Sequence, residues 1–155
     1  MQEFGAAFWE ASRAIRACRG RALQAHGLHA GQNVMLEQLW REDGLTPGEL
    51  AELIGIETPT VTRMAQRMER AGFVRRVPDT ADRRLVRVRL TEAGQRLRAV
   101  IPAAMARADE QALAGFTPAE RGRFVDFLRR TARNLEGAGG WVSASGPRRR
   151  TRRGG

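Results

Sequence analysis

Apolar residues recur every three or four positions over a stretch that begins near Thr58. At the angular step of an α-helix, one side of this stretch collects Val61, Met64, Ala65, Met68 and Ala71. The opposite side collects Thr62, Arg63, Gln66 and Arg70, with Thr60 and Arg67 on its flank. The pattern predicts a helix that buries one face and presents a polar, basic face to its surroundings.

Local signals place the ends of this helix and of a shorter one before it. Residues 46–49 read Thr-Pro-Gly-Glu, a capping box with proline at the first helical position. Gly55 permits the tight turn that follows this first helix. Thr58 is the expected N-cap of the second helix, with Pro59 at its first position, and Gly72 is expected to end it. Two short helices joined by a tight turn are typical of a helix-turn-helix.

The period then changes from that of a helix to that of a strand. Val86, Val88 and Leu90 alternate with arginines, the two-residue repeat of a half-buried strand. Residues 73–77 are the expected partner strand, and 78–84 form a polar loop between them. The sequence therefore predicts a hairpin, or wing, directly after the helix-turn-helix.

Charge indicates what this unit binds. Nine arginines and three acids lie between Arg63 and Arg89. A polar helix beside a basic hairpin suits the major groove of DNA and the surrounding phosphates. Asp82 precedes Arg84 by two residues and is expected to fix its guanidinium, which would suit a narrow minor groove. The alternative is a solvated turn whose charges only maintain solubility.

Apolar spacing also predicts helices on both sides of the winged unit. In the first, a coiled-coil-like seam steps by three and four residues: Phe4, Phe8, Ala11, Ile15, Cys18 and Ala22. A second, buried helix covers 34–40. A long helix follows Thr91, kinked or broken at Pro102, and 117–120 forms another capping box before a last helix. These helices are expected to intertwine with a second copy, the alternative being packing within one chain.

Several of these segments together resemble the DNA-binding domain of the MarR (multiple antibiotic resistance regulator) family. The resemblance rests on residues 45–51, Thr-Val-Thr-Arg at 60–63, 68–74, Asp-Arg-Arg at 82–84 and Leu-Thr-Glu-Ala-Gly at 90–94. It covers roughly 8–135. It implies a homodimer of winged domains that binds near-palindromic double-stranded DNA, often as a repressor released by a small ligand or by oxidation.

The resemblance also implies roles for single residues. Arg63 aligns with the family's base-reading arginine, Thr60 with a phosphate-contacting hydroxyl, Arg84 with the wing-tip arginine and Asp82 with the acid that orients it. The full set of predicted DNA-binding residues is Thr46, Thr58, Thr60, Thr62, Arg63, Gln66, Arg67, Arg70, Asp82, Arg83 and Arg84.

These elements give a mainly α fold with a small β-hairpin wing, flanked by dimerisation helices. The predicted parts are an N-terminal dimerisation helix (1–29), a winged helix-turn-helix domain (30–91), C-terminal dimerisation helices (92–136) and a flexible basic tail (137–155). The tail carries five of the arginines and is expected either to add phosphate contacts or to be merely solvated.

Composition narrows the function further. The net charge is +10 with an isoelectric point near 11.6, which favours a polyanionic partner. All 27 basic residues are arginine, a bias typical of GC-rich bacterial genomes. No apolar run is long enough to span a membrane and no export signal is visible. The single cysteine, Cys18, fits a reducing cytoplasm.

Catalytic motifs are missing from the sequence, so an enzyme, a cofactor and a metal site are not expected. His26 and His29 are interpreted as loop histidines because a zinc site would need further ligands. Cys18 is interpreted as a seam residue.

By analogy with the family, an aromatic or phenolic ligand would lie between the dimerisation helices and the winged domain. The candidate liners are Trp9, Arg13, Arg16, His29 and Trp40.

Two functions from different classes follow. The first is a sequence-specific dimeric regulator, a repressor of nearby genes released by a ligand. The second is a constitutive DNA-binding or architectural protein without an effector. A weaker third is a winged module used for contacts between proteins.

Overall fold

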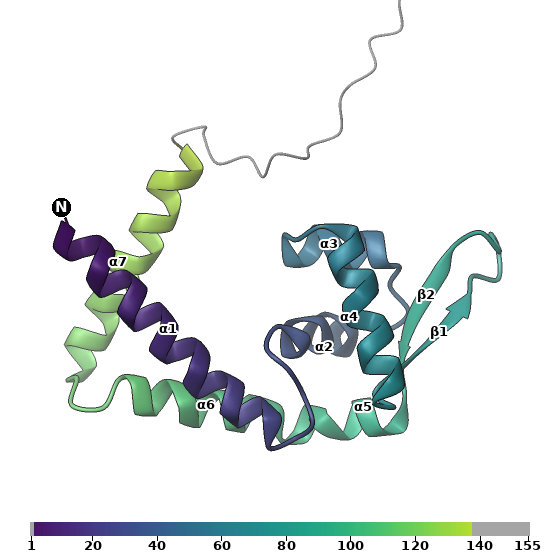
Figure 1. The fold of residues 1–155 in the computed structure, drawn as a ribbon, viewed down its shortest axis with the longest axis horizontal. Helices are drawn as coiled ribbons and strands as arrows, with labels where there is room; N and C mark the ends of the chain where they lie inside the picture. Colours follow the sequence, from purple (N-terminus) through teal and green to yellow (C-terminus); the bar gives the residue numbers. More distant parts are fainter. Residues whose placement is uncertain (1, 138–155) are drawn as a thin grey trace, which may run out of the picture. The chain divides into compact units, whose positions relative to one another are not determined.

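The computed structural model describes residues 2–137, which form helices and one β-hairpin (Figure 1). In chain order the elements are α1 (Gln2–Gln24), α2 (Gln32–Arg41), α3 (Pro47–Ile54), α4 (Thr58–Arg70), β1 (Val74–Pro78), β2 (Val86–Leu90), α5 (Glu92–Arg96), a 3₁₀ turn η1 (Leu97–Ala99), α6 (Ile101–Ala112) and α7 (Pro118–Gly137). The mainly helical fold with a small hairpin was predicted from the sequence. The predicted basic tail, apart from Gly137, lies outside the described residues.

Contacts along the chain divide it into two compact units. The first runs to Ala112 and holds α1 to α6 with the hairpin, and the second begins at Leu113 and holds α7. Among residues 2–137, no helix combines the length and apolarity that crossing a membrane requires. The domain boundaries expected at 29/30 and 91/92 remain sequence predictions.

One apolar core joins the helices of the first unit to the hairpin. Its largest fully buried side chains come from the α1–α2 loop, α2, α3, α4, both strands and the start of α6: Leu28, Met35, Leu36, Leu39, Leu50, Val61, Met68, Val74, Val88 and Ile101. Burial of such side chains is worth about 1.5–3 kcal/mol each. This shared core fixes α4 against the hairpin.

The hairpin pairs β1 and β2 in an antiparallel register from Val74 opposite Leu90 to Pro78 opposite Val86. A third segment joins it at Gly44 and Leu45: the N–H of Val88 donates to the carbonyl of Leu45, and the N–H of Gly44 donates to the carbonyl of Val88. Alternation correctly placed β2, although Val86 at its outer end is 38% exposed. The contact at Leu45 was not predicted, because it links residues far apart in the sequence.

The capping predictions are confirmed at α3 and α7 and wrong at α4. In both correct cases a threonine hydroxyl accepts from the backbone N–H three residues on, while the glutamate there accepts from the threonine N–H. At α4 the N-cap is Glu57, and Thr58 is already helical. The side chain of Glu57 makes no capping hydrogen bond, and the carbonyl of Thr58 accepts from the hydroxyl of Thr62 at 2.9 Å.

The long helix expected after Thr91 is interrupted, as the proline at 102 suggested. It consists of α5, η1 and α6, and the break falls at Val100, directly before α6 begins. Val100, at this break, is 39% exposed. The first part of the apolar seam of α1 is exposed, since Phe4 and Phe8 are 65% and 52% exposed, while Ala22 at its other end packs against the core.

Candidate nucleic-acid interface

The recognition helix candidate is α4, whose two faces differ as the sequence predicted. Val61, Ala65 and Met68 are buried against the core. Arg63 and Arg67 are exposed on the other face. A helix held by its apolar face and exposing arginines can enter a major groove and donate to base edges and phosphates.

The other predicted DNA-binding residues on the helices differ in whether their side chains are free to contact DNA. Thr60 and Arg70 are exposed, and Gln66 is half-buried. Thr46 uses its hydroxyl to cap α3, accepting from Glu49 N–H at 3.2 Å. Thr62 already donates its hydroxyl proton to a backbone carbonyl within α4. Thr46 thus has the capping role that the sequence predicted, while Thr62 has a structural role that sequence reasoning did not assign.

The turn between α3 and α4 is built around Gly55. Its φ of 75° is a left-handed conformation that glycine adopts without steric cost. The N–H groups of Gly55 and Ile56 both donate to the carbonyl of Ala51, at 2.9 and 3.1 Å. This cap ends α3 and sets the position from which α4 starts.

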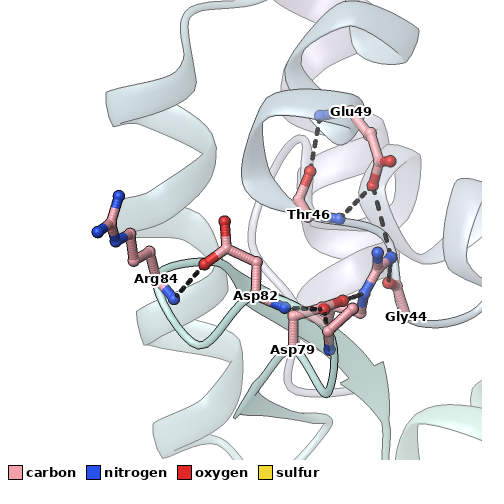
Figure 2. Close-up of polar contacts among 8 residues, drawn as sticks. Gly44, Thr46, Glu49, Asp79, Asp82 and Arg84 are labelled. Atoms are coloured by element: carbon pink, nitrogen blue, oxygen red, sulfur yellow. Dashed lines mark hydrogen bonds and ion pairs between the residues drawn. The ribbon is translucent and has the colours of Figure 1, made fainter.

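Asp79 organises the loop at the far end of the wing (Figure 2). One carboxylate oxygen accepts from the backbone N–H groups of Ala81 and Asp82, at 2.7 and 2.9 Å. The other accepts from the side-chain Nε of Arg87 on β2. These bonds, led by the one from Asp82, lower the pKa of Asp79 from 3.8 to about 2.

Arg87 links this loop to the start of α3. Its NH1 group donates to the carbonyl of Gly44 at 2.8 Å and lies 3.9 Å from a carboxylate oxygen of Glu49. The hydrogen bond with Asp79, then the charges of Asp79 and Glu49, raise the pKa of Arg87. The guanidinium therefore stays charged and ties the wing to the helix-turn-helix.

Two further acids attach the wing to its surroundings. Glu69 on α4 accepts from both the backbone N–H and the Nε of Arg76 on β1, at 2.8 and 2.7 Å. The pKa of Glu69 is lowered, chiefly by the bond from that backbone N–H. Asp43 accepts from the N–H of Leu90 on β2 at 2.8 Å. The wing is thus held from α4, from the α2–α3 loop and from α3.

The predicted contact between Asp82 and the guanidinium of Arg84 is wrong. The Asp82 carboxylate accepts from the backbone N–H of Arg84 at 3.0 Å, and the guanidinium points away from it (Figure 2). A side chain two residues earlier in a tight loop reaches the backbone more easily than the end of a long arginine. Asp82 therefore shapes the loop, while the guanidinium of Arg84, like the neighbouring Arg83, is exposed.

The five candidate ligand residues do not gather in one cleft. The guanidinium of Arg16 lies 5.8 Å above the Trp9 ring, both on α1, and Arg13 is exposed on the same helix. Trp40 packs against the core and donates its Nε1–H to the carbonyl of Gly94 at 3.0 Å.

His29 lies elsewhere, in a hollow of about 330 Å³ beside Arg63 and Arg67 of α4. Trp40 therefore has a structural role, and His29 lies next to the candidate DNA-binding surface.

Sequence reasoning missed Asp43, Asp79 and Arg87. Asp79 carried a usable signal, because an aspartate after a proline in a loop commonly caps nearby backbone N–H groups. Arg87 carried none, since its contact with Gly44 joins residues 43 positions apart.

Comparisons with known proteins agree on one family. The sequence profile of the MarR family matches residues 28–86. The uncharacterized HTH-type transcriptional regulator YybA of Bacillus subtilis is 28% identical over 109 residues, covering 70% of this chain and 73% of that protein.

Two solved structures extend the likeness to most of the fold. The PcaV transcriptional regulator of Streptomyces coelicolor superposes with a TM-score of 0.78 at 26% identity, covering 86% of this chain and 97% of that one. BpsR of Bordetella bronchiseptica, whose structure is described as a mechanism for regulation of its DNA binding by 6-hydroxynicotinic acid, gives 0.72 at 25% identity, covering 84% and 98%.

Proposed function

Because the chain belongs to the MarR family and is a DNA-binding transcriptional regulator, we propose that it acts as a homodimer on a near-palindromic operator. A twofold dimer presents two copies of α4 in related orientations, and such a pair fits two inverted half-sites about one turn of DNA apart. DNA of this kind lies in the bacterial cytoplasm, where the protein would act.

The observation that carries this proposal is the exposed arginine face of α4 beside an anchored wing. Arg63 would read a base edge in the major groove, with Thr60 and Arg67 contacting phosphates. Arg84 at the wing tip would enter the adjacent minor groove. The bonds from Arg76 to Glu69 hold β1 to α4, and the bond from Arg87 to Gly44 holds β2 to the α2–α3 loop, which supports this arrangement.

Exposed apolar side chains support the homodimer. On α1 Phe4, Phe8 and Trp9 are 52–65% exposed, and on α7 Phe127 and Leu135 are 59% and 67% exposed. Large apolar side chains exposed in this number on one helix are costly in water and typical of an interaction surface. A second copy that covers α1 and α7 would bury them.

We further propose that the protein represses nearby genes and that a small aromatic or phenolic ligand releases it from DNA. The regulation of BpsR by 6-hydroxynicotinic acid supports a ligand of this class. To test release, the complex with DNA flanking the protein's own gene would be titrated with a panel of aromatic acids. Unchanged DNA affinity across the panel would contradict release by an aromatic ligand and favour the alternative of a constitutive DNA-binding protein.

The DNA-binding proposal is tested by Arg63→Ala on that flanking DNA. Loss of a bidentate base contact should cost about 1–3 kcal/mol of binding free energy and relax discrimination at one position of each half-site. The readout is a mobility-shift titration with a footprint.

Arg98→Ala removes the same charge from an exposed position outside the interface and serves as the matched control. Wild-type affinity and footprint for Arg63→Ala would show that α4 does not read DNA through this residue.

A further inference from the structure

His29 lies at the edge of the candidate DNA-binding surface, in the hollow of about 330 Å³ beside α4. Helix α4 contributes Thr60, Arg63 and Arg67 to the lining of this hollow, and the start of α2 contributes Gln32. Under the proposed function Thr60 and Arg67 contact phosphates while Arg63 reads a base edge. The imidazole of His29 therefore borders the space that a phosphate of the bound DNA would occupy.

The packed chain fixes the backbone that carries this imidazole. The side-chain oxygen of Gln32 accepts from the N–H of His29 at 2.8 Å, and the N–H of Gln32 donates to the carbonyl of His29 at 3.1 Å. Gln32 is only 3% exposed, and Leu28, directly before His29, is fully buried in the core. A contact residue whose backbone is already held in the free protein loses little conformational entropy when it binds.

The charged side chains that line the hollow with His29 are all basic. Arg63 and Arg67 come from α4, the lining residue from α2 is the neutral Gln32, and no carboxylate is among the lining residues. An anion is therefore the complementary occupant of this space. A phosphate brought into it favours the protonated imidazole over the neutral one, because a nearby anion stabilises a cation.

We propose that His29 is a further DNA-contact residue, which donates to a backbone phosphate beside Arg67 and takes up a proton from the solvent as the complex forms. The inference rests on the proposed function, since it places α4 in the major groove. A protonated imidazole makes a charge-assisted hydrogen bond to a phosphate oxygen, which is stronger than one from the neutral ring. Because binding takes up a proton, DNA affinity rises as the pH falls.

The composition of the chain makes this proton measurable, because histidine is the side chain that ordinarily changes charge between about pH 8 and about pH 5.5 and the chain has only two. The affinity of the full-length protein for labelled DNA flanking its own gene would be measured by fluorescence anisotropy at these two pH values. We expect the affinity at the lower pH to be about tenfold higher for each half-site occupied, as for one hydrogen bond to a charged group. The slope of log affinity against log salt should steepen by about 0.9 for each phosphate newly neutralised.

Three variants assign the proton to one residue. His29→Gln retains hydrogen-bonding atoms but takes up no proton, so it should bind DNA equally at the two pH values. His29→Arg carries a permanent charge and should bind at the higher pH as tightly as the wild type does at the lower one. His26→Gln removes the other histidine, which lines a different hollow, and should behave like the wild type.

The loop should tolerate these substitutions, because Gln32 bonds to the backbone of residue 29 and not to its side chain. Thermal unfolding of each variant at both pH values checks that the fold is kept.

Several results would overturn the role of His29 while leaving DNA binding intact. Wild-type affinity that is equal at the two pH values would exclude the proton uptake, and a pH dependence that persists in His29→Gln or disappears in His26→Gln would assign the proton to another group. His29→Arg that binds no more tightly than the wild type at the higher pH would exclude the phosphate contact. A wild type that fails to bind DNA at either pH would overturn the proposed function itself and this inference with it.

Discussion

Asp79 is a buried carboxylate, 7% exposed, that satisfies two backbone N–H groups and one arginine at once. Its pKa is lowered to about 2 from 3.8, first by the N–H of Asp82 and then by Arg87. Because the folded-state pKa lies below the unfolded one, folding favours the ionised form. This stabilisation is complete above about pH 4 and is lost as pH falls towards about 2.

Asp79→Asn should therefore lower the thermal unfolding temperature at pH 7, and the difference from the wild type should shrink between about pH 4 and pH 2. Circular dichroism melts over a pH series measure this difference. Asp126→Asn, at an exposed carboxylate 3.6 Å from Arg129 in α7, is the control and should change little. A difference that stays constant down to pH 2 would show that the ionised carboxylate contributes no stability.

At the scale of elements, the wing is a short hairpin whose tip carries exposed arginines and whose base is fixed. We expect Arg84→Ala to weaken DNA binding most where the flanking sequence is A·T-rich and its minor groove narrow. Asp82→Ala should give a smaller loss of the same kind, because it frees the loop backbone that places Arg84 but leaves the guanidinium charge.

Titrations of both variants on A·T-rich and G·C-rich flanks, across a salt series, measure these effects. If Arg84→Ala weakens DNA affinity equally on both flanks, the wing contacts phosphates without preference for the shape of the groove.

The junction between the hairpin and α5 depends on the absence of a side chain at Gly94. A methyl group there would lie 2.1 Å from the carbonyl oxygen of Phe73, which already accepts from Thr91 N–H. Gly94→Ala should destabilise the fold by about 3 kcal/mol, because backbone rather than a side chain must move.

Gly20→Ala is its control, since nothing lies within 4 Å of the added methyl in α1. This change should be neutral or raise stability by up to about 1 kcal/mol through helix propensity. Chemical denaturation compares the two variants, and equal effects would contradict the close approach at Gly94.

At the scale of the whole molecule, the exposed apolar side chains of α1 and α7 predict that the protein forms a homodimer through these helices. Light scattering at micromolar concentration should give about twice the chain mass of 17.2 kDa. Phe8→Glu should shift the protein towards the monomer, because a charge would be buried in the interface.

Leu53→Glu places the same charge on an equally exposed apolar residue of α3, outside the proposed interface, and should leave the mass unchanged. A monomeric wild type would contradict the homodimer and with it the two-half-site mode of DNA binding.

Short-range patterns in the sequence determined the elements of this protein. Spacing of apolar residues gave the two faces of α4, alternation gave β2, and threonine–glutamate pairs gave the starts of α3 and α7. These features depend on residues within a few positions of one another, where backbone geometry alone fixes what lies on one face. The arginine face of α4 followed from them, and the family was indicated by the resemblance of short motifs such as Leu-Thr-Glu-Ala-Gly at 90–94.

Contacts between distant residues were decided only by tertiary structure. Arg87 contacts Gly44, Leu45 pairs with β2, and α1 packs against α6, where Arg19 binds Asp109. The error at Asp82 was local instead, because its carboxylate accepts from a backbone N–H only two residues away, which a short side chain reaches more easily than the end of a long arginine. The long-range contacts depend on which groups the packed chain brings within about 3 Å, a distance that no spacing along the sequence encodes.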